Sequence, residues 1–564
     1  MGALQRHEAQ KFCIDTKSTF FGCSLDGDSA FEVVCRPIQK RELYFAGESG
    51  QLAQYNHASY TNTQTCIKMN GKISKPLHEN LGVGQGKIRS SDHYKNYINP
   101  VLLTLDKADL GVNIGPINVG ISGVADDLYL ISDRQEKLQG LLDIAHHYGK
   151  NYRTEYGPQK TVISMVGSKI DMEYYQDVQP WSMESKTVSV KENNDHLGLV
   201  VSGLREEEKN IDARIKKARG ALFNFIGPVF STRCLLSPSL LLHVFRTYIC
   251  PIARSGLSAM SLRETHLEPI AVFQRKMLKS FLSISDKAPT PAIHFLTGEL
   301  PINAKIHRDV FGLFYNVWSN PQTKVYDIVK YLLENAPKNS NTWSAHLKNL
   351  ASIYDMEDPL AMIKRTPPPK ESFKKYVAAK ITSHWERKLR KAAELNRKMT
   401  FLNVSLKGLN GRAHPALNGV FLTKDIPKLR AHIKLLSGDL LTYEMRSIYC
   451  GSSPHCRLCH LDQDIERKPK EDVCHILTEC PAFKESRQRI IAEIRDVCKE
   501  SQYELIEIFS TNALLTQFIL DCTSLNLPVR ISPEDPLCEK VFVLSRDLTY
   551  SILLQRTRML KLLQ

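Results

Sequence analysis

Short apolar runs of strand length open the chain. Ser18 to Leu25 is one such run, and it ends in an acidic turn that begins at Asp26. A second run covers 112–125, breaks at Asp126-Asp127, and resumes over 128–132. This pattern predicts a β-hairpin that carries two carboxylates at its tip.

Helical periodicity follows these runs. Residues 135–148 have apolar side chains at helical spacing, and 161–166 return to strand character. The order strand, hairpin, helix, strand predicts an α/β arrangement with helices on one face of a largely antiparallel sheet. After Gly203 helical patterns dominate, beginning with an apolar stripe over 211–222.

Composition narrows the classes of protein. The 564 residues include 75 Lys and Arg against 60 Asp and Glu, a net charge of +15. Such an excess favours an anionic partner, most often nucleic acid, with ribosomal clients and anionic membranes as alternatives. The longest apolar run, 235–253, contains His243, Arg246 and two prolines, so we interpret it as a buried helix pair and expect no membrane partner.

Five of the 14 cysteines lie between 450 and 480. Cys456-x-x-Cys459 is followed, after 15 residues, by His475-x₄-Cys480, a Cys₃His set with the short spacings of a structural zinc site. Cys474 and His460 are rival ligands in the same segment. Four ligands leave no open position, so we expect a structural Zn²⁺ and no catalytic water.

Two basic segments are candidates for phosphate contact. Lys216, Lys217 and Arg219 lie on the helix over 211–222. A denser run at 364–398 is interleaved with Phe373, Tyr376 and Trp385, which indicates binding of single strands by phosphate contact and base stacking. A solvated helix face is the alternative interpretation of both segments.

Five motifs in order resemble those of reverse transcriptases of the non-LTR (LINE-like) retrotransposon kind. The motifs are Asp26-Gly-Asp-Ser-Ala-Phe31, Gly82-Val-Gly-Gln85-Gly86, Val124-Ala-Asp126-Asp127, Gly149 with Lys160-Thr161, and His196-Leu-Gly198. Any one of them alone is weak, because an Asp-Asp pair at a turn is usually solvated. The third motif departs from the family, which has an aromatic residue where this chain has Val124.

The resemblance implies a fold and an organisation. It implies a ferredoxin-like palm, an antiparallel sheet with helices on one face, followed by an all-α thumb and a helical C-terminal region with a zinc knuckle. The regions it implies are 1–203, palm with partial fingers; 204–300, thumb; 301–435, helical basic region; 436–490, zinc knuckle; and 491–564, C-terminal helices. Because the chain begins 25 residues before Asp26, it is expected to be an N-terminal truncation that lacks most of the fingers.

The resemblance also implies an activity and its residues. Asp26 and Asp126 would bind two Mg²⁺ ions, with Mn²⁺ as an alternative, and Asp127 would support the second ion or a neighbouring group. Phe31 would lie against the sugar of the incoming deoxynucleotide, although an ordinary core Phe is an equal interpretation. Gln85 and Gly86 would contact the nascent base pair.

Lys160 would protonate the departing pyrophosphate or balance its charge, unless it is only a solvated side chain. The implied partners are an RNA template, a DNA primer or target, and dNTP. The implied location is an intracellular ribonucleoprotein in nucleus and cytoplasm.

Two other functions remain. The first is an inactive retroelement remnant that only binds nucleic acid through the zinc knuckle and the basic helices. The second is another palm-fold enzyme such as a nucleotide cyclase, which the Gly-x-x-Gln-Gly motif and the zinc element disfavour.

Overall fold

The computed structural model describes residues 1–563 except 26, 28–30, 85–88, 125–126, 155, 168, 227–235, 405–407, 419–422, 462–468, 501–505 and 526–530. These residues form two compact units, each built from segments that are separated in the sequence. The first unit comprises Met1–Ile211, Gly256–His266 and Asp309–Lys375, and the second comprises Asp212–Ser255, Leu267–Arg308 and Tyr376–Gln564.

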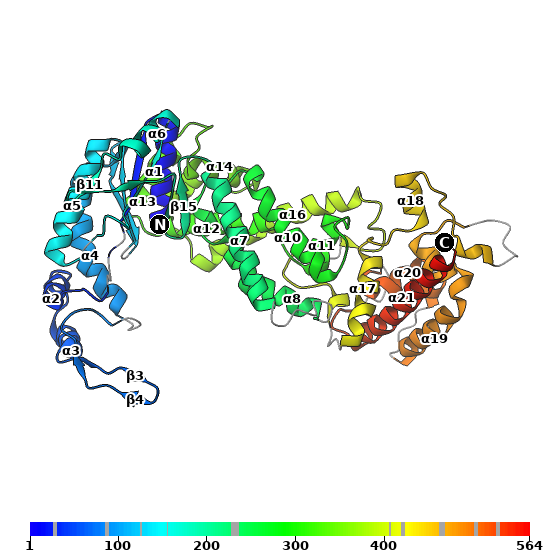
Figure 1. Ribbon diagram of the computed structural model, residues 1–564. Coiled ribbons are helices and arrows are strands. Elements are labelled where there is room, and N and C mark those ends of the chain that lie inside the picture. Colours follow the sequence, from blue (N-terminus) through cyan, green and yellow to red (C-terminus); the bar gives the residue numbers. More distant parts are fainter. Residues whose placement is uncertain are drawn as a thin grey trace. The chain divides into compact units, whose positions relative to one another are not determined.

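A five-stranded sheet lies at the centre of the first unit (Figure 1). Its strands, in spatial order, are β13 (Ser189–Val190), β10 (Val162–Val166), β1 (Phe20–Leu25), β9 (Asp127–Ser132) and β8 (Ile121–Val124). β1 is antiparallel to both β9 and β10, β8 and β9 form a hairpin, and β10 pairs with β13 in parallel. The apolar runs of the sequence therefore correctly located β1, β10 and the two hairpin arms next to Asp126-Asp127. The run 112–125 is not one strand, because its first part forms a separate hairpin of β6 (Val112–Ile114) and β7 (Ile117–Val119).

Two helices cover one face of this sheet. They are α4 (Ser90–Lys107) and α5 (Gln135–Tyr152), and the second contains the helix expected at 135–148. Leu25, Leu128 and Leu130 of the strands share a buried core with Tyr97 of α4 and Leu141 of α5. Every second side chain of β1 and β9 points to this face, because successive residues of a strand point to opposite faces of the sheet.

The opposite face is also covered. The intervening strand residues Phe20, Tyr129 and Ile131 are apolar too, and they pack with residues of α1 (Gly2–Thr16), the hairpin β6 (Val112–Ile114) and β7 (Ile117–Val119), and α13 (Lys324–Asn335). A Cβ at Gly22 would overlap the Tyr129 ring, so only glycine fits there. The sequence pattern indicated helices on one face, but both faces of these strands are apolar and both are covered.

Buried polar contacts tie distant segments to α1. Glu8 accepts hydrogen bonds from Trp343 N at 2.8 Å and Ser344 N at 2.9 Å, and thereby caps α14 (Trp343–Ile353). Arg6 forms a buried ion pair with Glu206 at 2.6 Å, at the start of α7 (Glu206–Ile226). The contacts of Glu8 join residues 309–375 to the unit that contains the sheet, and the Arg6–Glu206 pair joins the start of α7 to it.

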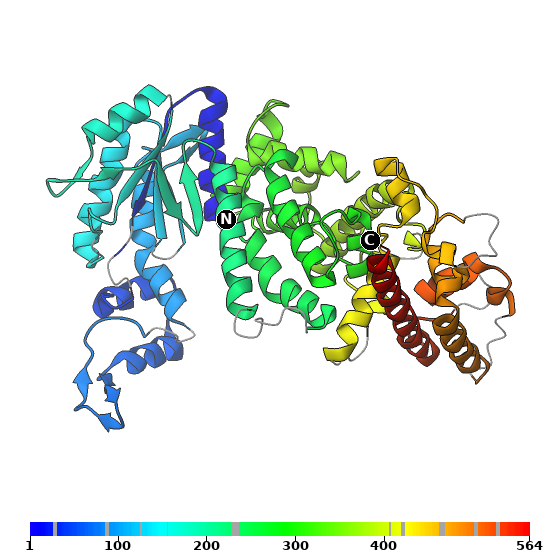
Figure 2. The same cartoon turned by 45° about the vertical axis from the view of Figure 1, so that its right-hand side comes forward.

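The chain between β1 and α4 forms α2 (Arg36–Phe45), α3 (Gly50–Tyr60) and two short hairpins (Figure 2). The hairpins pair β2 (Gln64–Thr65) with β5 (Leu77–His78) and β3 (Lys68–Met69) with β4 (Lys72–Ile73). The other small elements of the unit are α6 (Lys169–Val178), β11 (Ser182–Met183), β12 (Lys186–Thr187), β14 (Asn193–His196), β15 (Leu199–Ser202) and α15 (Pro359–Ile363).

From 206 onward the described residues form helices, turns and one β-bridge between His455 and Lys470. The second unit contains α8 (Pro238–Val244), α9 (Cys250–Arg254), most of α10 (Glu264–Leu282), α11 (Thr290–Thr297), α17 (Ile426–Leu436), α18 (Tyr443–Cys450), α19 (Lys484–Glu500), α20 (Asn512–Leu520) and α21 (Pro536–Leu562). Boundaries between the units fall within α7, α10, α12 (Ile302–Trp318) and α16 (Lys370–Glu394). Among the described helices, none combines the length and the apolar character needed to cross a bilayer.

Candidate functional site

The described ends of β1 and β9 meet at one edge of the sheet. Leu25 pairs with Leu128, and Val124 pairs with Asp127 across the hairpin. Asp127 is exposed at this edge. Asp26 and Asp126 lie outside the described residues, although each is the sequence neighbour of a residue in these pairs.

A cleft of about 680 Å³ opens beside this edge. Asp127 and Lys160 both line it, so the structure brings together two residues that are 33 positions apart in the predicted site. Lys191 and Lys209 line the same cleft, and Lys209 forms an ion pair of 2.5 Å with Glu192. Three ammonium groups, one of them paired with Glu192, and the exposed carboxylates of Asp127 and Asp195 line the cleft, so cationic and metal-binding groups lie side by side, as a triphosphate site requires.

The hairpin of β14 and β15 forms another wall of this cleft. Leu197 and Gly198 occupy its two-residue turn with φ of 49° and 74°, as a type I′ turn requires. His196 is 4% exposed and its ring centroid lies 4.7 Å from that of Tyr129. Burial, followed by the charge of Arg6, lowers the pKa of His196 to about 3, so the imidazole is neutral at pH 7.

Residues of the first two motifs pack against each other. Val83 N donates to Phe31 O, and Gly82 N donates to Val34 O, both at 2.8 Å. Gly82 has φ of +82°, and a Cβ there would come within 2.8 Å of Glu32 O, so glycine is required for this approach. Gln85 and Gly86, the predicted nucleotide contacts, lie outside the described residues.

Phe31 is half-buried, and its ring stacks on Tyr94 of α4 with centroids 4.8 Å apart. This packing holds the ring beside the sheet core. It agrees with the interpretation of Phe31 as a core residue, and the role of Phe31 beside a sugar stays a prediction.

Four side chains in the second unit form the cluster that their spacing indicated. The ligand atoms of Cys456, Cys459, His475 and Cys480 all lie within 4.8 Å of one another, and all four residues are buried. Cys480 Sγ is 4.0 Å from Cys456 Sγ and 3.8 Å from Cys459 Sγ, and Cys459 Sγ is 3.2 Å from His475 Nε2. Tetrahedral coordination with Zn–S bonds of about 2.3 Å separates thiolates by about 3.8 Å, so a zinc ion fits this cluster.

Electrostatics and neighbouring carboxylates suit the same ion. The hydrogen bond from the Cys480 thiol lowers the pKa of Cys456 to about 3, and the thiolate is the form that binds metal. Burial raises the pKa of Cys459 and the hydrogen bond to Cys456 raises that of Cys480, so these two thiols release their protons when the metal binds. His475 Nδ1 lies 3.4 Å from Glu479 Oε2, which orients Nε2 toward the cluster. The rival ligand Cys474 is not in the cluster. Its Sγ lies 3.5 Å from Thr478 Oγ1. The side chain of His460 lies outside what the structure describes.

Two aromatic residues of the basic segment do not behave as expected for base stacking. Phe373 is 5% exposed and packs on Tyr315 with centroids 5.3 Å apart, and Trp385 is 7% exposed. The helical periodicity of α16 places both on its buried side. Of the three predicted stacking residues only Tyr376, at 38% exposure, presents a substantial surface.

Sequence reasoning missed several residues that belong to these sites. Lys191 and Lys209 flank the His196 motif, so their proximity to that motif was the available signal. Glu479 lies four residues after His475 on the same helical turn, which is the spacing of a carboxylate partner.

No protein-family model and no curated protein matches this chain. Among solved structures, the chain is similar to telomerase from Candida albicans in complex with a TWJ fragment of telomeric RNA, at 10% identity and a TM-score of 0.27. The match covers 70% of this chain and 52% of the telomerase chain, so this chain spans about half of that protein's length. A similarity this low defines neither the fold nor the family.

Proposed function

We propose that this chain is an RNA-directed DNA polymerase similar to the non-LTR retrotransposon reverse transcriptases. It would transfer a nucleotidyl group from dNTP to the 3′-hydroxyl of a primer paired with an RNA template. The observation that carries the proposal is the meeting of the third and fourth motifs at one cleft, where Asp127 and Lys160 lie with Lys191 and Lys209.

Acidic residues at this edge are suited to Mg²⁺, which prefers carboxylate and phosphate oxygens. Asp127 is exposed at the cleft, and Asp26 and Asp126 adjoin the paired ends of β1 and β9 in sequence. When bound there, two divalent ions would stabilise the charge on the attacking and leaving oxygens. Asp26 and Asp126 would hold both ions, with Asp127 beside the second.

Cationic residues of the cleft would act on the triphosphate. Lys160 would donate a proton to the departing pyrophosphate or balance its charge. Lys191 and Lys209 would hold phosphate oxygens near Asp127, because a polymerase must bind a polyanion close to its own carboxylates. Neutral His196 adds no charge to this surface.

The zinc knuckle would have a separate, structural role. Its four ligands leave no open coordination position, so it would stabilise a local fold that contacts template RNA or target DNA. The fold class, the intracellular location as a ribonucleoprotein and the membership of a retrotransposon are parts of the same proposal.

Primer extension tests the proposal. The intact chain with a DNA primer on an RNA template, Mg²⁺ and dNTP should extend the primer, and Asp126→Asn should abolish extension. Asp143→Asn is the matched control, because Asp143 is exposed on α5 outside the cleft. Lys160→Gln should retain RNA binding but extend more slowly.

Two outcomes would contradict the proposed polymerase activity. Extension that survives Asp126→Asn would mean that another protein or another site is responsible. A chain that extends no primer but shifts RNA in a gel, in a salt-sensitive way, would instead be the nucleic-acid-binding remnant.

A further inference from the structure

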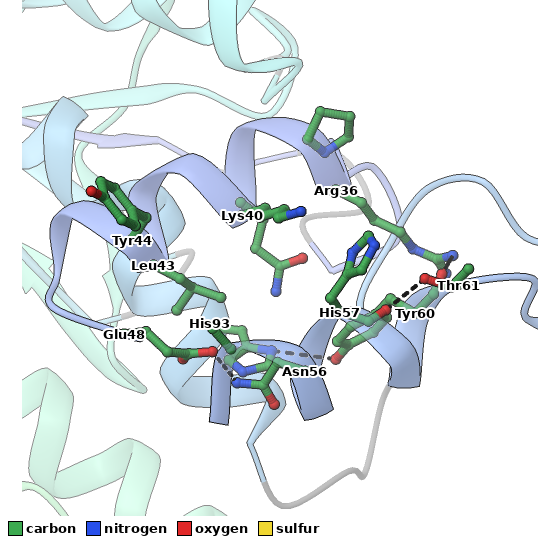
Figure 3. Close-up of a pocket in the computed structure, with 13 residues that line it drawn as sticks. Arg36, Lys40, Leu43, Tyr44, Glu48, Asn56, His57, Tyr60, Thr61 and His93 are labelled. Atoms are coloured by element: carbon green, nitrogen blue, oxygen red, sulfur yellow. Dashed lines mark hydrogen bonds between the residues drawn. The ribbon is translucent and has the colours of Figure 1, made fainter. Parts of the chain in front are cut away.

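A second pocket of the first unit, of about 320 Å³, lies between α2 and α3 (Figure 3). It shares none of its lining residues with the cleft at Asp127. The side chains that matter for its chemistry are those of Gln39, Lys40, Leu43, Asn56, Tyr60 and His93. Its volume is near the lower limit for small-molecule sites.

Two buried polar atoms of this pocket have no hydrogen-bond partner. Gln39 is 3% exposed and His93 is 2% exposed, and the Nε2 atom of each is without a partner within the described structure. The other ring nitrogen of His93 lies 3.4 Å from the Tyr60 hydroxyl. Leaving such a group buried and unsatisfied costs about 1–3 kcal/mol, so both atoms favour a polar ligand. The Gln39 amide nitrogen needs an acceptor, and His93 Nε2 donates in one imidazole tautomer and accepts in the other.

Apolar and aromatic groups form the remaining surface. Leu43 is buried at the pocket, and the Tyr60 ring borders it. Tyr44, at 70% exposure, lines its edge and stands beside Phe45, at 72% exposure. Exposed aromatic rings next to an apolar pocket are typical of sites that stack planar rings.

The charge of the pocket favours an anionic group at its edge. Its one carboxylate among the described lining residues, Glu48, is engaged by Asn56 and lies 3.5 Å from Arg89. Arg36 donates to Gly82 O and Tyr60 O at 3.0 Å, so its guanidinium is already used. Lys40 is exposed and has no ion pair or hydrogen bond with the described residues, so its ammonium remains available.

We propose that this pocket binds the nucleobase of a nucleotide, with acceptor atoms of the base facing Gln39 and His93 and the phosphate near Lys40. With His93 in the tautomer that donates from Nε2, a base edge with two acceptors, such as N7 and O6 of guanine, would satisfy both buried nitrogens. The nucleotide is either free or an unpaired residue of an RNA strand. The inference does not depend on polymerase activity, since none of these residues belongs to the proposed catalytic set.

Calorimetry tests the inference by measuring the affinity of the intact chain for 5′-GMP and for a guanine-containing RNA octamer. Gln39→Leu should weaken binding about tenfold and should also raise the melting temperature, because it replaces an unsatisfied amide by an apolar group of similar size. A purely structural Gln39 would instead lower the melting temperature on substitution. Gln54→Leu, at an exposed position of α3 outside the pocket, is the matched control and should leave both values unchanged.

The phosphate contact has its own test. Lys40→Gln should weaken 5′-GMP binding but not guanosine binding, because guanosine lacks the phosphate. Binding of 5′-GMP supports a free nucleotide, and binding of the octamer alone, lost when its guanines are replaced by abasic residues, supports a strand. The inference is wrong if neither 5′-GMP nor the octamer binds, or if Gln39→Leu leaves their binding unchanged.

Discussion

The link between the zinc knuckle and α21 gives the sharpest prediction on stability. Glu471 has a fully buried side chain, and it receives a hydrogen bond of 2.6 Å from Arg556 of α21, whose side chain is 10% exposed. Tyr443 N donates to the same carboxylate at 3.0 Å, and Cys456 Sγ lies 3.9 Å from it. Arg556→Met removes the only cation paired with Glu471 among the described residues.

Removing one partner of a buried ion pair costs about 3–5 kcal/mol, because the other charge stays buried without compensation. Arg556→Met should therefore lower the protection of knuckle and α21 amides in hydrogen exchange by that amount. The double variant Arg556→Met with Glu471→Gln should be more stable than Arg556→Met alone, because it leaves no unpaired charge.

Arg558→Met, at an exposed position of the same helix, is the control and should change stability by less than about 0.5 kcal/mol. If Arg556→Met and Arg558→Met had equal effects, or if the double variant were less stable than Arg556→Met, the buried ion pair would not hold α21 to the knuckle.

Three further predictions concern the other buried groups. Metal analysis should find no zinc bound to Cys459→Ser and one zinc bound to Cys474→Ser, because only Cys459 belongs to the cluster. Equal zinc content of the two variants would contradict the site. Glu8→Ala should destabilise the first unit by about 2–4 kcal/mol in hydrogen exchange, since two N–H groups of α14 lose their acceptor, and no change in α14 would contradict the cap. The pKa of His196 is about 3 when folded against 6.5 for the free side chain, so its stabilisation is complete above pH 6.5 and is lost as pH falls. Between pH 7 and 5 the wild type should lose about 2 kcal/mol more than His196→Leu, and parallel pH profiles would disprove the assignment.

Local patterns in the sequence were enough for the elements around the cleft. β1, β10 and the hairpin of β8 and β9 each follow from apolar runs and turn residues within a few positions. The zinc cluster also follows from spacing, because short loops between ligands restrict where the ligands can lie.

Contacts between distant segments could not be predicted in this way. Glu8 caps a helix that begins 335 residues later, and no local signal marks that partner. The second layer on the sheet depends on the same kind of contact. The basic segment shows the opposite error, since its aromatic residues at Phe373 and Trp385 indicated stacking surfaces but lie in the core.

Single-nucleotide incorporation shows whether the chain copies an RNA template. The intact chain is given a DNA primer on four RNA templates that differ only at the first unpaired base, with Mg²⁺ and each dNTP in turn. A template-directed polymerase should add only the complementary deoxynucleotide to each template, and Asp126→Asn should add none. Addition that ignores the template base, or no addition by a chain that binds all four templates, would contradict the proposed polymerase activity.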